Sequence, residues 1–187
     1  MTSMSSECRV RVTTGDITRL EVDAIVNAAN HSLMGGGGVD GAIHRAAGPE
    51  LKQACRRLRE TDWPDGLPDG EVALTDGFNL PARYVIHTVG PVYAKTKDKS
   101  HLLANCYRNA LALADEHDCR SIAFPAISTG VYGYPFDEAA RVVIDVLAEA
   151  TSEDAPEVIL CFFSERDAGA FEAICEETGF PVCAEHG

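Results

Sequence analysis

Two glycine-rich stretches are the strongest candidates for ligand binding. The first glycine loop is Gly35-Gly36-Gly37-Gly38, and the second glycine loop runs from Ser128 to Gly133. Four consecutive glycines cost more conformational entropy than a turn requires, which favours a close approach of a ligand to the backbone. Backbone N–H groups exposed beside a helix N-terminus attract anions. The alternative is an ordinary surface loop or turn in each place.

The residues around the first glycine loop argue against two common classes of nucleotide-binding site. No Lys-Ser or Lys-Thr pair ends the loop, so the lysine and magnesium ligand of nucleotide triphosphatases are missing. No convincing Gly-x-Gly-x-x-Gly frame is present, which argues against NAD redox chemistry. Two glycine loops could instead supply amide donors to both sides of a diphosphate.

Polar side chains flank the glycine loops. Asn30 could exchange hydrogen bonds with a sugar, although asparagine before a loop is also an ordinary turn former. Asp40 has the default interpretation of a helix N-cap, yet an acid beside an anion site must face something else. Asp16 could accept a hydrogen bond from an exocyclic amine or serve as a turn residue. Tyr132 could pack on a sugar or a base.

Alternating strands and helices must position these residues. Apolar and β-branched runs predict strands over 9–14, 24–28, 71–76, 84–89, 121–127 and 158–163. Helical spacing predicts helices over 41–59, 102–117, 136–150 and 165–178. This order predicts an α/β fold with a largely parallel sheet, whose ligands bind beyond the carboxyl ends of the strands. Both glycine loops fall at that edge.

Bulk composition is typical of one globular domain. The chain has 187 residues with 45% hydrophobic content, so we expect a single domain over 1–187 with its core at about 9–179. The net charge of −13 and the lack of a basic patch argue against nucleic-acid binding. No apolar run is long enough to predict a membrane span.

The seven cysteines show no Cys-x-x-Cys spacing, and most fall in apolar periodic segments. Free cysteine behaves there as a small hydrophobic residue. We therefore expect reduced structural thiols in a cytoplasmic protein, with neither disulfides nor a metal site.

Taken together, four segments resemble the macrodomain family, and within it the MacroD-type branch. They are Gly15-Asp16-Ile17-Thr18, the long block 26–48, Ile86-His87-Thr88-Val89-Gly90-Pro91, and 124–135. Their order and spacing extend over nearly the whole chain, from about Arg9 to Gly179. The long block is the most specific, because it joins Asn27-Ala28-Ala29-Asn30 to the first glycine loop and the helix behind it.

The resemblance implies a three-layer α/β/α sandwich with a mixed, roughly six-stranded sheet, and ADP-ribose as ligand. Asp16 would contact the adenine amine, Ile17 would lie beside the ring, and Phe163 would stack on it. The glycine loops would hold the diphosphate and distal ribose, and Tyr132 would close over that ribose. The implied ligand-binding residues are Asp16, Ile17, Asn30, Gly36, Gly37, Gly38, Val39, Ser128, Thr129, Gly130, Val131, Tyr132 and Phe163.

The same resemblance implies hydrolysis of ADP-ribosyl esters. Members of this branch remove mono-ADP-ribose from acidic side chains of proteins and deacetylate O-acetyl-ADP-ribose. Asn30 would orient the distal ribose, and Asp40 would position or activate the attacking water. His44 is expected to be a packed helix histidine. No cofactor or metal is implied, and we expect a monomer. Two alternatives stay open: a module that binds ADP-ribose without cleaving it, and a phosphatase acting on ADP-ribose-1″-phosphate.

Overall fold

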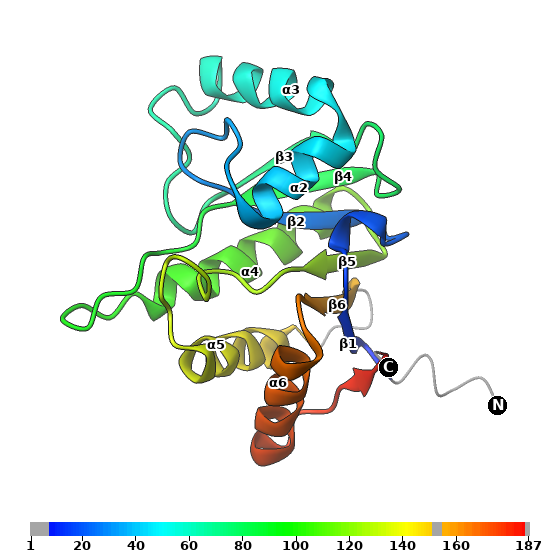
Figure 1. Cartoon of the computed structure of the whole chain (residues 1–187), viewed down its shortest axis with the longest axis vertical. Coiled ribbons are helices and arrows are strands. Elements are labelled where there is room, and N and C mark those ends of the chain that lie inside the picture. Colours follow the sequence, from blue (N-terminus) through cyan, green and yellow to red (C-terminus); the bar gives the residue numbers. More distant parts are fainter. Residues whose placement is uncertain (1–7, 151–154, 186–187) are drawn as a thin grey trace.

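Seven strands form one mixed sheet with helices on both faces in the computed structural model, which describes residues 8–150 and 155–185 (Figure 1). The strand order is β3-β4-β2-β5-β6-β1-β7. The predicted three-layer α/β/α sandwich is confirmed, and the six predicted strands are joined by a short seventh at the edge. The strands are β1 (Val10–Thr14), β2 (Ala24–Ala28), β3 (Val72–Asp76), β4 (Tyr84–Thr88), β5 (Ser121–Phe124), β6 (Glu157–Phe162) and β7 (Cys183–Ala184).

The helices divide between the two faces of the sheet. They are the 3-10 helix η1 (Ile17–Arg19), α2 (Gly38–Ala47), α3 (Pro49–Glu60), α4 (Ser100–Glu116), α5 (Phe136–Glu149) and α6 (Glu165–Thr178). Helices α2 and α3 pack on one face, and α4, α5 and α6 cover the other. Every strand pair is parallel except β3 with β4. The connection 77–83 between these two is too short for the crossover that a parallel pair needs.

Alternation along the strands builds a core on each face of the sheet. In β2, Ile25 belongs to the cluster beneath α2 and α3, whereas Val26 belongs to the cluster beneath α4, α5 and α6. Successive side chains of a strand point to opposite faces, so strands buried on both sides read as continuous apolar runs. This explains why the sequence shows nearly continuous apolar segments at 24–28 and 121–127.

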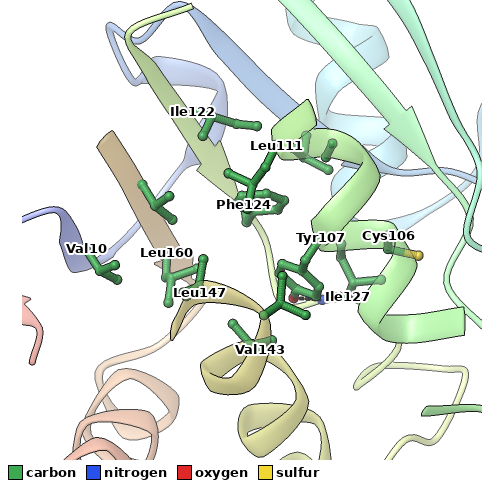
Figure 2. Close-up of a cluster of buried hydrophobic side chains, with 14 of the residues drawn as sticks. Val10, Cys106, Tyr107, Leu111, Ile122, Phe124, Ile127, Val143, Leu147 and Leu160 are labelled. Atoms are coloured by element: carbon green, nitrogen blue, oxygen red, sulfur yellow. Dashed lines mark hydrogen bonds between the residues drawn. The ribbon is translucent and has the colours of Figure 1, made fainter. Parts of the chain in front are cut away.

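The larger core cluster also fixes the start of the second glycine loop (Figure 2). The rings of Tyr107 on α4 and Phe124 at the end of β5 pack with centroids 4.8 Å apart. The Tyr107 hydroxyl donates to the Pro125 carbonyl at 3.4 Å and accepts from the Ile127 N–H at 3.5 Å. The chain leaving β5 is thus held against α4 before it reaches Ser128.

The prediction of one helix over 41–59 is wrong. The segment forms two helices, because Gly48 adopts a φ of 93° and Pro49 begins α3. Proline has no N–H to continue the preceding helix and is favoured in a first turn. The apolar positions continue across the break because both helices bury one side against the same face of the sheet.

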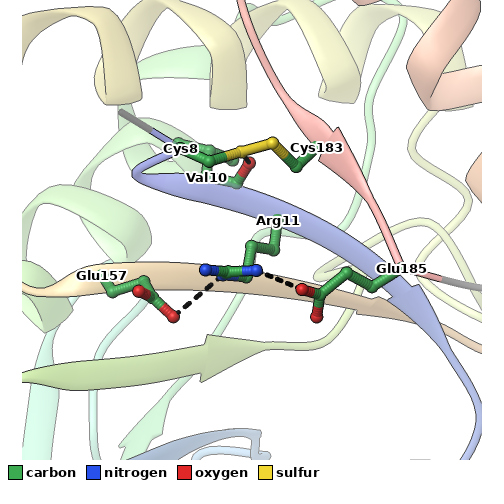
Figure 3. The surroundings of a disulfide bond; sticks show 6 residues. All are labelled: Cys8, Val10, Arg11, Glu157, Cys183 and Glu185. Carbon is green, nitrogen blue, oxygen red and sulfur yellow. Dashed lines mark hydrogen bonds and ion pairs between the residues drawn. A yellow bond between two sulfur atoms is a disulfide. The ribbon is translucent and has the colours of Figure 1, made fainter. Parts of the chain in front are cut away.

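A disulfide joins Cys8 to Cys183, with Cα atoms 6.1 Å apart (Figure 3). The prediction that all cysteines are reduced thiols is therefore wrong for this pair, while the other five, all buried, are free. The cause is the pairing of β1 with β7, which brings together residues 175 positions apart. Arg11 on β1 adds ion pairs to Glu157 on the neighbouring β6 and to Glu185, which directly follows β7.

Gly169 offers a simple test of helix stability. It lies exposed inside α6, and a Cβ atom there would meet nothing within 4 Å. We expect Gly169→Ala to raise the free energy of unfolding by about 0.5–1 kcal/mol, because alanine loses less backbone entropy in a helix. Urea titration of both oxidised proteins measures it, and an unchanged free energy would contradict the expectation.

Among residues 8–150 and 155–185, no helix combines the length and apolar character needed to cross a bilayer.

Candidate functional site

The carboxyl ends of four neighbouring strands line one edge of the sheet. The order β2, β5, β6, β1 places four loops side by side, because these strands are parallel. The first glycine loop lies between β2 and α2, and the second follows β5 (Figure 1). Phe163 follows β6, and Asp16 follows β1. The structure therefore brings the predicted site residues to one edge.

The side chain of Asn30 hydrogen-bonds to the chain that follows it, up to the first residue of the first glycine loop. Its Oδ1 accepts hydrogen bonds from the Ser32 N–H at 3.1 Å and the Ser32 hydroxyl at 2.6 Å. Its Nδ2 donates to the Gly35 carbonyl at 3.0 Å. The side chain is thus held in one orientation at the entrance of the glycines. The turn-forming interpretation of Asn30 is confirmed, and its contact with a ligand stays a prediction.

Asp40 is not the N-cap of its helix. Helix α2 begins at Gly38 with Gly37 as N-cap, so Asp40 stands in the first turn and is only 4% exposed. Its carboxylate faces inward, where Oδ1 accepts a hydrogen bond of 2.8 Å from Nδ2 of Asn27 on β2. The interpretation as a cap is wrong because the glycines let the helix start two residues before Asp40.

Gly36 lies between the two predicted catalytic side chains. A Cβ atom placed on it would be 3.3 Å from Oδ2 of Asp40 and 3.4 Å from Nδ2 of Asn30. Asn30, Gly36 and Asp40 therefore converge, although the sequence separates the outer two by ten positions. A side chain at this position would crowd both the carboxylate and the amide, which explains the need for glycine.

Helix α2 approaches the first glycine loop at Gly41. A Cβ atom on Gly41 would lie 2.5 Å from the carbonyl oxygen of Gly36, which is closer than real atoms come. The loop therefore rests directly on the backbone of the helix. No side chain caps the N-terminus of α2, so its first N–H groups remain available to an anion.

Burial dominates the electrostatics of Asp40. It raises the pKa of this carboxyl above the ordinary value, while the hydrogen bond from Asn27 and the nearby His44 oppose that rise. Burial also lowers the pKa of His44. Nε2 of His44 is 3.5 Å from Oδ1 of Asp40 and has no hydrogen-bond partner among the described residues. The two side chains therefore pack against each other, and they form an ion pair only when His44 is protonated.

Hydrogen bonds to the buried side of the second glycine loop, and within the loop, fix its conformation. The Ser128 hydroxyl donates to the Pro91 carbonyl at 2.8 Å, so any ligand contact of Ser128 falls to its backbone. The loop closes on itself through the Gly133 N–H to Gly130 carbonyl bond of 3.0 Å. Its tip is exposed: Val131 is fully open to solvent. Tyr132 is half-buried, and its carbonyl accepts the N–H of Tyr93.

The far end of the site combines an exposed ring with a fixed carboxylate. Phe163 is 94% exposed, which is costly for an aromatic side chain without a ligand. Oδ1 of Asp16 accepts from the N–H and hydroxyl of Thr18, and chiefly the hydroxyl bond lowers the pKa of Asp16. The Ile17 side chain is buried in the core, so it offers its backbone to the site.

Two buried polar residues next to the site were not predicted from the sequence to have a role. Asn27 and His87 lie on the central strands β2 and β4 and are fully buried. Their polar side chains within otherwise apolar strands were the available signal, since buried polar groups need partners. No group of three or more metal-ligating side chains occurs among residues 8–150 and 155–185.

The parallel strands bring two glycine loops, an uncapped helix N-terminus and an exposed aromatic ring to one edge of the sheet. This arrangement is typical of an α/β protein that binds an elongated, anionic ligand. A Macro domain family model matches residues 26–143, and the chain belongs to this family.

Relatives cover most of the chain. A Macro domain-containing protein of Chlorobaculum tepidum is 55% identical over 160 residues, 84% of this chain and 90% of that protein. A substituted Oceanobacillus iheyensis macrodomain, solved with ADPR, matches with a TM-score of 0.86 and 48% identity, covering 92% of this chain and 94% of that one. The Trypanosoma brucei macrodomain in complex with ADP-ribose matches with a TM-score of 0.77 and 42% identity, over 89% and 68% respectively.

Proposed function

We propose that this protein binds ADP-ribose and hydrolyses ADP-ribosyl esters in the manner of the MacroD-type branch. The observation that carries the hydrolytic part is the convergence of Asn30, Gly36 and a buried Asp40 at one end of the site. Its substrates would be O-acetyl-ADP-ribose and proteins that carry mono-ADP-ribose on aspartate or glutamate.

The order of the loops gives the ligand a direction. Neighbouring strands are about 5 Å apart, so the edge from β2 to β1 spans about 15 Å. Adenine would lie at the β6 and β1 end, with Phe163 stacked on the ring and Asp16 accepting from its amine. The diphosphate would lie between the glycine loops, and the distal ribose would reach Asn30.

The amide-based anion site agrees with the charge of the chain. Backbone N–H groups and the N-terminus of α2 can hold a diphosphate although the protein carries a net charge of −13. Two of the matching structures, from Oceanobacillus iheyensis and Trypanosoma brucei, contain ADPR or ADP-ribose, which supports the choice of ligand.

Asp40 would act as the general base. Its Oδ2, the oxygen nearer Gly36, would take a proton from water, whose oxygen would attack the ester. Attack on the carbonyl carbon would break its bond to the ribose oxygen, ADP-ribose would leave with the proton returned from Asp40, and the acyl part would be released as acetate or as a protein side-chain carboxylate. The loop amides and the diphosphate would help to orient that water.

Turnover of the two ester substrates tests the proposal. The protein is incubated with O-acetyl-ADP-ribose and with a protein ADP-ribosylated on acidic residues, and released ADP-ribose is measured. Release of ADP-ribose supports hydrolysis. Tight binding of ADP-ribose in calorimetry without release would instead support a binding module, and phosphate release from ADP-ribose-1″-phosphate would indicate a phosphatase.

Phe163 provides a test of the ligand orientation. We expect Phe163→Ala to weaken ADP-ribose binding about fivefold, because stacking of a base on an aromatic ring is worth about 1 kcal/mol or more. Isothermal titration calorimetry with ADP-ribose and with ribose 5-phosphate measures the effect, and only the ligand with adenine should respond. An equal loss for both ligands would place adenine elsewhere.

A further inference from the structure

A row of buried polar side chains extends from Asp40 across the face of the sheet that α2 and α3 cover. Nδ2 of Asn27 lies 2.8 Å from Oδ1 of Asp40 and 3.1 Å from Nδ1 of His87. Nε2 of His87 lies 3.0 Å from Oγ1 of Thr75 on β3. All four residues are buried, and Asn27 and His87 are fully so. The row links the proposed catalytic carboxylate to β3, which lies two strands away from β2 in the sheet.

Counting donors and acceptors assigns the protons along the row. The amide nitrogen of Asn27 carries two hydrogens, of which one goes to Asp40 and the other to His87. Nδ1 of His87 must therefore accept, and the ring proton lies on Nε2, which donates to Thr75. Burial lowers the pKa of His87 to about 3, so the ring stays neutral.

The orientation of the Asn27 amide leaves one atom unpaired. Its Oδ1 is buried without a hydrogen-bond partner among the described residues. An amide turned the other way would direct its oxygen at the Asp40 carboxylate, so that two acceptors would face each other. The carboxylate therefore favours the orientation with the NH₂ group toward it, and Nδ1 of His87 accepts the second amide hydrogen, which offsets the cost of the unpaired oxygen.

We propose that His87 is a positioning residue for the reaction: Nδ1 of His87 accepts one amide hydrogen of Asn27 and so directs the other at Asp40, which holds that carboxylate in place. The catalytic consequence rests on the proposed function, whereas the effect on Asp40 does not. The ring nitrogens of His87 face Asn27, Thr75 and Cys55, so its effect on Asp40 is transmitted by Asn27.

Other groups face Asp40 from the packed elements. His44 lies one turn further along α2, and Lys52 of α3 acts on His44. Cys55 of α3 lies 3.9 Å from Nε2 of His87, and burial raises its pKa to about 12, so it remains a thiol. A titration assigned to Asp40 must therefore be distinguished from that of His44.

Two substitutions of His87 distinguish the roles of its two ring nitrogens. Asparagine places an oxygen where Nδ1 stands and preserves the acceptor for Asn27, whereas glutamine reaches the position of Nε2 and loses that acceptor. The Asn27 hydrogen bond lowers the pKa of Asp40. Losing it favours the protonated carboxyl, so the pKa of Asp40 rises and the acidic limb of the pH–kcat profile moves to higher pH.

The direct measurement is the carboxyl carbon chemical shift of Asp40 against pH in the ligand-free protein, assigned with Asp40→Asn. A hydrogen bond to a charged group corresponds to about one pKa unit. We expect His87→Gln to raise the pKa of Asp40 by about that amount and His87→Asn to leave it near wild type. The acidic limb for O-acetyl-ADP-ribose should move in parallel.

Equal pKa values in wild type and His87→Gln, or an equal rise in both variants, would overturn the proposal. If the variants do not fold, Thr75→Val replaces them, since it keeps the shape of Thr75 and leaves Nε2–H with only the weak acceptor Sγ of Cys55 at 3.9 Å. It should raise the pKa in the same direction, and no rise would count against the proposal. A shifted pKa of Asp40 without ester turnover would reject the proposed function and keep the role of His87.

Discussion

Asp40→Asn is expected to lower kcat for ADP-ribosyl-ester hydrolysis by about 10²- to 10⁴-fold, the usual contribution of a general base. The substitution keeps the size of the side chain, and its oxygen can still accept the hydrogen bond that Asn27 now donates to Oδ1. Only the charge and the basicity are removed. Steady-state kinetics on O-acetyl-ADP-ribose measure the change.

Binding serves as the control for the Asp40 prediction. The carboxylate faces inward, so calorimetry should give an ADP-ribose dissociation constant close to that of wild type. A rate preserved within a few-fold would show that the loop amides and the diphosphate orient the water without help from Asp40. Loss of both binding and rate would indicate a structural role for the carboxylate.

Gly41→Ala is expected to weaken ADP-ribose binding about a hundredfold. The new methyl group would meet the Gly36 carbonyl at 2.5 Å, and because that atom belongs to the backbone, the first glycine loop must move off α2. Loss of two amide-to-phosphate hydrogen bonds at about 1.5 kcal/mol each corresponds to that factor. Titration calorimetry with ADP-ribose tests it.

Gly169→Ala is the matched control, since it makes the same chemical change in a helix with open space. Its affinity for ADP-ribose should equal that of wild type. If Gly41→Ala binds equally well, the loop can relax without losing its donors, and the close contact between loop and helix is not needed for the site. A separate measurement of unfolding shows whether Gly41→Ala still folds.

Local pattern was sufficient for most of the fold. The predicted strand 24–28 and helix 165–178 coincide with β2 and α6. The spacing of apolar residues along a buried strand or an amphipathic helix indicates both the type of element and the side that it buries. The strand predicted over 121–127 ends at Phe124, because Pro125 has no N–H to donate to a neighbouring strand.

Two of the features that were predicted wrongly depend on residues far apart in the sequence, whereas the helix break at Gly48 and Pro49 has a local cause. The inward orientation of Asp40 requires Asn27 on β2 as a partner. The Cys8–Cys183 disulfide requires β7 to add to the sheet beside β1. Neither is visible in local spacing. The glycine loops themselves were recognisable because glycine at such density has few purely structural explanations.

The disulfide between β1 and β7 also determines how the molecule would respond to mechanical force. Consider a force that pulls on the chain before Cys8 and after Cys183. With the two cysteines joined, this force is transmitted through the disulfide, and the sheet and the ligand site bear none of the load. Without the bond, the 175 positions between them would be free to extend to about 600 Å. The oxidised protein is thus a closed ring whose folded part is shielded from tension.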